Sequence, residues 1–268
     1  MLREVTIGQY YPVDSVLHRL DPRVKLLATL LYLLSLFLMQ SWSGYAFAAL
    51  VLCLLIRLSR VPVRFLTRGL RGILFILLLS VSFNLFLTPG TVLVQLGILK
   101  ISREGLRIAI MMALRLILLV IGSSIMTLTT TPNQLTDGLE KGLGFLRLLH
   151  VPVHEIAMMM SIALRFIPIL IEETDKIMKA QQARGADFES GGLLRRARAL
   201  VPILVPLFIS AFRRASELAM AMEARCYHGG EGRTKLKPLR YERRDRNAYL
   251  LLALYLLCCI GIRFLPLP

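Results

Sequence analysis

Apolar runs separated by short polar breaks alternate along the first half of this chain. Four runs occupy residues 24–40, 42–58, 72–87 and 103–131, and a fifth occupies 247–265. With their flanking residues they approach or exceed the roughly 20 residues that a helix needs to cross a bilayer. The pattern predicts an all-α membrane protein with about five transmembrane helices.

The segment between the fourth and fifth runs follows a different pattern. Apolar residues recur there at intervals of three and four among many charges, which is typical of amphipathic helices. Its most apolar stretches, Ile156–Ile171 and Ala199–Phe212, are hydrophobic enough to be taken for spans, but charges flank them and prolines or Arg165 interrupt them. We therefore expect long amphipathic cytoplasmic helices, in or beneath the membrane interface, between spans four and five.

Positive charge determines the expected orientation. The end of the second run and its connection to the third contain no acid and five arginines, at Arg57, Arg60, Arg64, Arg68 and Arg71. Because basic loops stay on the cytoplasmic side, the N-terminus is predicted to be cytoplasmic and the C-terminus external. The expected divisions are a membrane domain at 1–131 with an N-terminal cytoplasmic segment, a cytoplasmic domain at 132–246 and a final transmembrane helix at 247–268.

The composition agrees with a membrane protein, and the placement of its charges argues against a nucleic-acid partner. Of 268 residues, 56% are hydrophobic, and the mean hydropathy of +0.63 is far above that of soluble proteins. A net charge of +16 can indicate nucleic-acid binding in a soluble chain. Here the basic residues lie between apolar runs, where cytoplasmic loops and anionic lipid headgroups account for them. The expected surroundings are a lipid bilayer, and no nucleic-acid partner is predicted.

Local signals predict where helices begin and end. Asp21 before Pro22 is typical of a helix N-cap with proline at the first helical position. Pro132, after three threonines, is expected to end the fourth span. Asn84 and Arg115 lie inside spans. A charge at that depth is either a functional site or part of helix packing, and packing is the interpretation we favour for Arg115.

The chain offers little catalytic chemistry. His150 and His154 are four residues apart, but Pro152 between them interrupts the helix that a zinc motif needs. A solvated face is the simplest account of three acids beside lysines, Glu172, Glu173 and Asp175. We predict no catalytic residue, no metal site and no cofactor bound by this chain.

A short motif occurs twice in the segment at 132–246, about forty residues apart. Each copy follows a proline-marked apolar run and then a run of alanine, methionine and charge: Ala183-Arg184-Gly185 and Ala224-Arg225-Cys226. Gly185 is predicted to end the first helix in the left-handed conformation, and Gly229 and Gly230 are candidates to end the second. Each arginine then lies on the last turn of a long helix and points outward.

Two interpretations of these arginines are open. A cation at a helix C-terminus is favoured by the helix dipole and needs no partner. Alternatively, the planar guanidinium binds a carboxylate of another protein, and the small alanine beside it permits close approach. Recurrence after two similar helices favours the second interpretation. The flexible side chains of Met158, Met159 and Met160 present a similar choice between core packing and a partner surface.

Together these residues resemble the transmembrane T component of energy-coupling factor (ECF) transporters, the EcfT/CbiQ family, of the type shared among substrates. The likeness is carried by four features: residues 17–23 (Leu-His-Arg-Leu-Asp-Pro-Arg), residues 129–132 (Thr-Thr-Thr-Pro), residues 164–168 (Leu-Arg-Phe-Ile-Pro) and both Ala-Arg motifs. In that family two cytoplasmic coupling helices cross, and each motif docks into one of two ATPase subunits. Cys226 departs from the family, which usually has a small residue such as glycine there, so the second helix is a candidate for a different end.

The resemblance implies roles for individual residues. The expected ATPase-binding residues are Ala183, Arg184, Gly185, Ala224, Arg225 and Cys226. The residues expected to contact a small substrate-binding membrane protein, the S component, are Met158, Met159, Met160, Leu164, Pro168, Pro202 and Pro206. ATP and Mg²⁺ are expected in the two ABC-type ATPase subunits rather than in this chain.

The predicted function is a non-catalytic coupling subunit of an ATP-driven importer of vitamins or other micronutrients, in the plasma membrane of a prokaryote. One alternative is a stand-alone secondary transporter or channel, which needs polar groups inside interrupted spans. Only Asn84 and Arg115 suggest this. A membrane-embedded hydrolase is the other alternative, and it needs a nucleophile or metal cluster at membrane depth. The transported substrate does not follow from the sequence.

Overall fold

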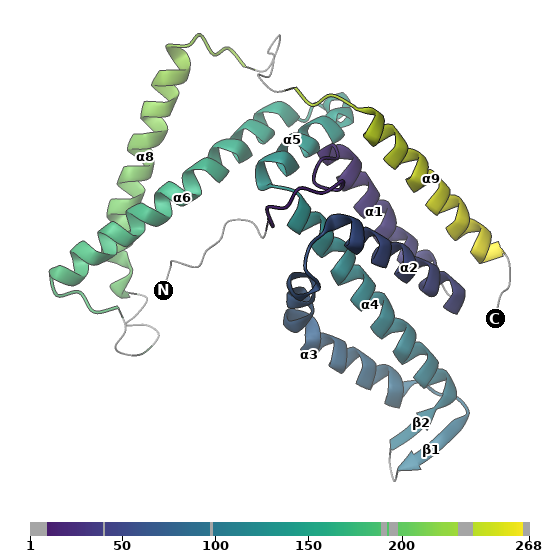
Figure 1. Cartoon of the computed structure of the whole chain (residues 1–268). Coiled ribbons are helices and arrows are strands. Elements are labelled where there is room, and N and C mark those ends of the chain that lie inside the picture. Colours follow the sequence, from purple (N-terminus) through teal and green to yellow (C-terminus); the bar gives the residue numbers. More distant parts are fainter. Residues whose placement is uncertain are drawn as a thin grey trace. The chain divides into compact units, whose positions relative to one another are not determined.

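A computed structural model describes residues 10–39, 41–96, 99–188, 192, 198–229 and 238–264 (Figure 1). The described residues belong to two compact units. One, the bundle unit, comprises Gly8–Lys141 and Leu239–Pro268. The other, the crossed-helix unit, comprises Gly142–Pro238. Each unit is built almost entirely from helices, as the hydrophobic pattern predicts.

The bundle unit contains six helices and one strand pair in its described part. The helices are α1 (Pro22–Leu38), α2 (Trp42–Ser59), α3 (Val63–Leu87), α4 (Arg103–Thr129), α5 (Pro132–Gly142) and α9 (Arg243–Phe264). The antiparallel strands are β1 (Val92–Leu96) and β2 (Leu99–Ser102). The crossed-helix unit contains the 3₁₀ helix η1 (Gly144–Leu149), α6 (Val153–Ala183) and α8 (Val201–Glu223).

The start of α1 confirms the predicted N-cap. The side chain of Asp21 accepts a hydrogen bond from the backbone N–H of Arg23 at 2.9 Å, and Pro22 occupies the first helical position. The backbone N–H of Asp21 donates to the buried carboxylate of Asp245 at 2.9 Å. This bond joins the first turn of α9 to the first turn of α1, although 224 residues separate them. The predicted break at Pro132 is also confirmed, because α4 ends at Thr129 and α5 begins at Pro132.

The core of the bundle unit lies where α1, α2 and α4 meet, with α9 alongside. Leu36 and Tyr45 are fully buried there, and Leu118 and Ile125 of α4 pack against them. Helices α1 and α4 approach closely at Gly122, where a Cβ atom would lie 2.6 Å from the ring of Tyr32. A larger residue at position 122 would therefore push these helices apart.

Arg115 of α4 has a structural role in this core. Its guanidinium donates to the hydroxyl of Tyr45 at 2.9 Å and to the backbone oxygen of Met39 at 3.3 Å. It also lies over the rings of Phe37 and Tyr45. Met39 is the C-cap of α1, so this cation and the Tyr45 hydroxyl together satisfy a carbonyl that has no partner within the helix. These contacts support the packing interpretation of Arg115.

The turn between α1 and α2 lies beside the middle of α4 rather than beside its first residues. At one end of the bundle Lys25 of α1 donates to the backbone oxygen of Thr129, and at the other the C-cap of α1 meets Arg115. Twelve residues of α4, Arg103 to Leu114, precede Arg115. At 1.5 Å per residue, this part of α4 is about 18 Å long. Figure 1 shows α3 and α4 extending together beyond the turn between α1 and α2.

The connection between α3 and α4, at residues 88–102, is more than a plain loop. Strands β1 and β2 form a hairpin there. Its base is held by the hydroxyl of Ser102, which donates to the backbone oxygen of Thr88 at 2.8 Å, and by Glu104, which accepts from the N–H of Thr91 at 2.8 Å. These bonds form because the ends of α3 and α4 are already adjacent, and that adjacency is not visible in a local pattern.

Five described helices are long and apolar enough to cross a membrane by length and composition: α2, α3, α4, α6 and α9. The number agrees with the predicted five spans, but the set differs in two members. Helix α1 has only 17 residues, about 25 Å, and is not among the five. Helix α6 is among them, although its sequence favours a position at the membrane interface. The chain is a multi-pass membrane protein with either set.

Candidate functional site

The first amphipathic segment forms one uninterrupted helix. Helix α6 runs for 31 residues, from Val153 to Ala183, and continues through Pro168. The apolar first half and the charged second half predicted from the sequence are therefore parts of a single helix, about 45 Å long. Helix α8 has 23 residues and includes Pro206.

Helices α6 and α8 cross in opposite directions (Figure 1). Near the end of α6, the side-chain amide of Gln181 donates to the backbone oxygen of Pro202 at 3.3 Å. Toward the middle of both helices, Glu173 meets Ser210 and Arg214. A mostly apolar groove of about 290 Å³ lies between the two helices. It is lined by Ile162, Phe166 and Leu170 of α6 and by Ala211, Arg214, Ala215, Leu218, Ala219 and Met222 of α8.

Glu173 corrects one expectation from the sequence. It accepts hydrogen bonds from Ser210 at 3.0 Å and from Arg214 at 2.5 Å, and so it connects the two helices rather than belonging only to a solvated face. The bond from the Arg214 guanidinium, followed by that from Ser210, lowers the pKa of this carboxyl below its ordinary value. Glu173 lies in the charged half of α6, and its partner is 41 residues away. No short sequence window contains both residues.

Both Ala-Arg motifs end their helices with the same hydrogen-bond pattern. At the end of α6, Ala186 N–H donates to Gln181 O at 3.0 Å and Gly185 N–H to Gln182 O at 2.9 Å. At the end of α8 the equivalent bonds join Tyr227 to Met222 at 3.1 Å and Cys226 to Glu223 at 2.8 Å. Each is a Schellman motif with its left-handed residue directly after the arginine.

Cys226 therefore takes the place of glycine at the second helix end. Its φ of 54° is in the left-handed region, as is the 89° of Gly185. The predictions that Gly229 or Gly230 ends this helix, or that Cys226 gives it a different end, were wrong. Gly229 has a φ of 101° but follows the helix end, and Gly230 lies outside the described residues. A residue with a Cβ atom is sterically strained in this conformation, so cysteine at position 226 makes the helix end less stable than glycine would.

The two arginines are exposed and far apart. Arg184 and Arg225 each follow the last full turn of their helix, and both side chains are accessible. Because the helices are antiparallel, Arg184 lies near the start of α8, while Arg225 follows its end. The length of α8 separates them by about 35 Å. The motifs thus form two separate sites, one at each end of α8.

The residues expected to contact an S component lie mostly away from the α6–α8 groove. Met160, Leu164 and Pro168 recur every four residues and so form one stripe on α6, roughly opposite the stripe that lines the groove. Pro202 and Pro206 lie in the same way on α8. Met159 and Met160 are 58% and 41% exposed, whereas Met158 is only partly accessible. These positions leave an outward apolar face on each helix.

The structure adds four large residues that the sequence did not single out. Val205, Phe208, Ile209 and Phe212 of α8 are all more than half exposed. The rings of Phe208 and Phe212 pack together with their centroids 4.8 Å apart. The repeated spacing of three and four was the signal available in the sequence, but it does not tell which apolar face of a helix is covered.

Comparison with known proteins identifies the family. Residues 14–236 match the family model CbiQ, described as a cobalt transport protein. The chain is 53% identical over 264 residues to the energy-coupling factor transporter transmembrane protein EcfT of Thermosediminibacter oceani, covering 98% of this chain and 100% of that protein. The chain belongs to the ECF transporter T-component family. It is also 54% identical to EcfT of Clostridium kluyveri, with 96% of each chain covered, and 48% identical to EcfT of Bacillus subtilis, with 92% and 94% covered.

Membership explains the composition of the chain. A T component is the transmembrane part of a transporter, so its apolar helices face lipid or other membrane helices. The large apolar residues exposed along α3 and α9 agree with this surrounding, since hydrocarbon replaces water around them. The resemblance inferred from the residue motifs is thereby confirmed.

Proposed function

We propose that this T component couples ATP hydrolysis to substrate uptake. In this proposal two ATPase subunits, which bind ATP and Mg²⁺, pull on Arg184 and Arg225. Helices α6 and α8 transmit that movement to a small S component that carries a vitamin or another micronutrient. The chain itself performs no catalysis. It lies in the plasma membrane of a prokaryote with its N-terminus and both motifs in the cytoplasm.

One observation carries the proposal: two matching helix ends each present an exposed arginine, about 35 Å apart. A single small partner could not reach both ends, whereas two copies of similar subunits can each take one. An arginine at such an end binds a carboxylate through paired hydrogen bonds, and Ala183 and Ala224 leave room for the partner. Gly185 and Cys226 turn the chain away directly after each arginine.

The helices have the properties that a transmitting element needs. Helix α6 is continuous through Pro168, so one helix connects Arg184 to the first turn at Val153. Glu173, Ser210 and Arg214 bond it to α8 at the crossing. The outward faces that contain Met160, Leu164 and Pro168, and Pro202 and Pro206, supply apolar surface for the S component.

Composition alone also permits α6 to cross the membrane, and the charge distribution argues against it. The second half of α6 contains Glu172, Glu173, Asp175, Lys176 and Lys179. A crossing by α6 alone would place both Ala-Arg motifs and the arginines around α8 on the external side, and a crossing by α8 as well would put the two motifs on opposite sides. A helix at the interface keeps both motifs on one side.

Substitution of the two arginines tests the proposal. Arg184→Ala and Arg225→Ala are each expected to weaken ATPase retention about tenfold to a hundredfold, because each removes charge-assisted hydrogen bonds. The double variant is expected to lose ATP-driven uptake. The measurements are co-purification of the ATPase subunits and uptake into vesicles that contain the whole complex.

Matched controls separate docking from loss of charge. Lys179→Ala removes a cation from α6 near the same end, and Arg213→Ala removes an exposed cation from α8. Both controls are expected to retain the ATPases. Unchanged uptake in the Arg184→Ala, Arg225→Ala double variant would reject the proposal. Ion-driven uptake by the chain alone would favour a secondary transporter, although Asn84 and Arg115, which suggested that alternative, already bond to Ser80 and to Tyr45 and Met39.

A further inference from the structure

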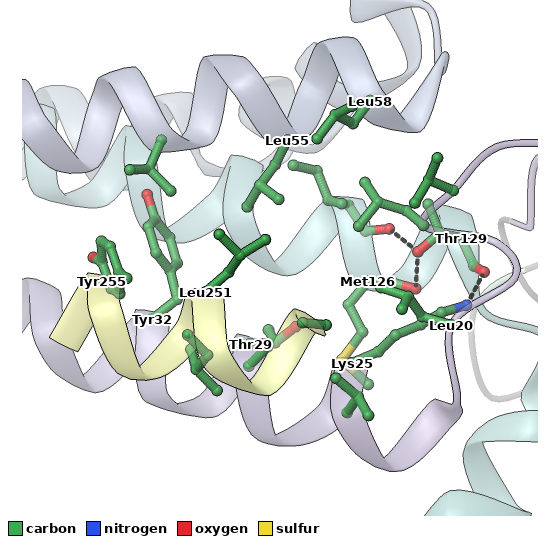
Figure 2. Close-up of a pocket in the computed structure, with 18 of the residues that line it drawn as sticks. Leu20, Lys25, Thr29, Tyr32, Leu55, Leu58, Met126, Thr129, Leu251 and Tyr255 are labelled. Atoms are coloured by element: carbon green, nitrogen blue, oxygen red, sulfur yellow. Dashed lines mark hydrogen bonds between the residues drawn. The ribbon is translucent and has the colours of Figure 1, made fainter. Parts of the chain in front are cut away.

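A cavity of about 360 Å³ lies inside the bundle unit, between α1, α2, α4 and α9. Its volume is within the range of sites that hold small molecules. Figure 2 shows Tyr32 and Tyr255 at one end of it, and Lys25 and Thr129 at the other. Most of the lining between these ends is aliphatic. Neither the Ala-Arg motifs nor the α6–α8 groove includes any residue of this cavity.

The cavity is open along one side. At its tyrosine end the rings of Phe47 in α2 and Tyr255 in α9 stack with centroids 5.6 Å apart, which closes the space between these helices. Toward the start of α9 the lining residues Leu58 of α2 and Leu251 of α9 are 43% and 67% exposed. The cavity is therefore a groove that is open between α2 and α9, and also beside Val16, a lining residue before α1 that is 56% exposed.

The helices on either side of the opening have the apolar outer surfaces of membrane-spanning helices. Helices α2 and α9 are both long and apolar enough to span a membrane. Leu54 and Leu254, on the outer surfaces of α2 and α9, are each more than half exposed, as expected for residues in contact with lipid. Since hydrocarbon surrounds the opening, a chain of hydrocarbon is the molecule best placed to enter it.

The end of the groove opposite the tyrosines is cationic. Arg244 lines it and pairs with the exposed carboxylate of Glu242, and Arg243 and Arg246 flank Arg244 in the first turn of α9. Both flanking arginines are exposed and make no ion pair with the described part of the chain. The buried Asp245 accepts from the backbone N–H groups of Asp21 and Glu242, so its carboxylate is already engaged in the protein. Lys25 lines the same end, and its buried ammonium group already donates to the backbone oxygens of His18 and Thr129.

An aliphatic groove that opens sideways to the bilayer, with arginines at one end, matches a lipid that has an apolar chain and an anionic head. We propose that this groove binds an anionic phospholipid, with one acyl chain between α2 and α9 and the phosphate at Arg244 and its neighbours. The attraction of basic side chains for anionic headgroups supplies the selectivity, and burial of the acyl chain supplies the affinity. The bound acyl chain would fill the gap between α9 and α2. This inference is independent of the proposed coupling function.

The test uses the purified full-length chain, or its complex, in detergent. Dioleoyl phosphatidylglycerol or dioleoyl phosphatidylcholine is added, and retained lipid is counted by native mass spectrometry. One phosphatidylglycerol per chain is expected to be retained, with phosphatidylcholine at least about fivefold weaker, because each basic residue near an anionic headgroup contributes roughly that factor. A thermal unfolding midpoint that rises with phosphatidylglycerol provides a second measurement.

Two pairs of variants locate the site. Ala248 lines the groove, whereas Ala253 lies on the exposed side of the same helix. Ala248→Trp is expected to lower phosphatidylglycerol retention at least about tenfold, since it fills the groove, while Ala253→Trp leaves retention unchanged. Arg244→Gln is expected to lower phosphatidylglycerol retention about fivefold without affecting phosphatidylcholine. Arg263→Gln, at the other end of α9, is its control.

Three results would overturn the proposal. Equal retention in Ala248→Trp and Ala253→Trp would place the lipid elsewhere on the surface. Equal retention of both lipids would show that the arginines do not select an anionic head. Loss of bound lipid when partner subunits are added would assign the groove to a partner helix. If Ala248→Trp is not monodisperse, Ala248→Leu and Arg244→Gln are judged by the same criteria.

Discussion

At single positions, the clearest result is that a cysteine and a glycine end two helices in the same way. Gly185 and Cys226 have φ values of 89° and 54° and donate equivalent hydrogen bonds to the preceding turn. Helix α8 therefore keeps the geometry of its motif although the residue differs. The backbone pattern of the helix end, rather than the glycine itself, is what the two motifs share.

The shared helix end predicts opposite effects for two substitutions. Gly185→Ala places a Cβ in the left-handed region, at a cost of about 1–2 kcal/mol, and is expected to raise amide hydrogen exchange at Gly185 and Ala186 roughly tenfold. Cys226→Gly removes such strain and is expected to slow exchange at positions 226 and 227. Gly144→Ala, which meets no neighbour and has no positive φ, is the control. Equal exchange in all three variants would contradict the assigned geometry.

Arg115 is expected to contribute to stability rather than to transport specificity. Arg115→Met leaves the Tyr45 hydroxyl and the Met39 carbonyl without their cationic donor, which costs about 1–3 kcal/mol of unfolding free energy. The measurement is the thermal midpoint of the chain in detergent, with the exposed Arg107→Met as control. A stable Arg115→Met protein that fails only in transport would instead favour a functional site.

Among the elements, the crossing of α6 and α8 depends on a bond that joins oppositely charged residues 41 positions apart. Both side chains are partly accessible, so the pair acts mainly by fixing the register of the crossing. In the proposed function, this register determines how movement of one arginine-bearing end reaches the other. The crossing is therefore the element whose geometry matters most for coupling.

Charge reversal tests the role of that crossing. Glu173→Arg and Arg214→Glu are each expected to reduce ATP-driven uptake, because each places like charges together at the crossing. The double reversal restores an opposite pair and is expected to recover part of the uptake. Glu172→Arg changes the neighbouring, exposed acid and serves as the control. The crossing would be irrelevant to coupling if the single reversals behaved like Glu172→Arg.

For the whole molecule, the open structural question is which side of the membrane each segment occupies. The proposal places both ends of α6 in the cytoplasm and the β1–β2 hairpin outside. The native cysteines at positions 53, 226, 258 and 259 are all free, so they can be replaced before single reporters are introduced.

Cysteine labelling on intact and lysed cells decides this orientation. A membrane-impermeant maleimide is expected to label Leu93→Cys, an exposed residue of the hairpin, in intact cells. Leu143→Cys and Ala186→Cys, which precede and follow α6, are expected to react only after lysis. Reaction of these two positions from opposite sides would mean that α6 crosses the membrane, and the coupling proposal would then need a different geometry.

Local rules were sufficient for much of this protein. The apolar runs predicted the helices, Asp21 and Pro22 predicted the start of α1, and the repeated Ala-Arg motif predicted two exposed cationic helix ends. These features follow from the chemistry of neighbouring residues, because helix periodicity and capping act within a few positions. The family resemblance also followed from short motifs.

Tertiary packing decided the remaining features, since each depends on groups distant in the sequence. The partners of Arg115 and Glu173 come from other helices, and the hairpin at β1 and β2 forms between helix ends that packing brings together. Cys226 takes the left-handed conformation although its residue type disfavours it, because carbonyls of α8 accept the hydrogen bonds of the turn. The groove between α2 and α9 exists only because four helices meet around it. Residues separated by tens or hundreds of positions share no local signal, and only the folded chain places them together.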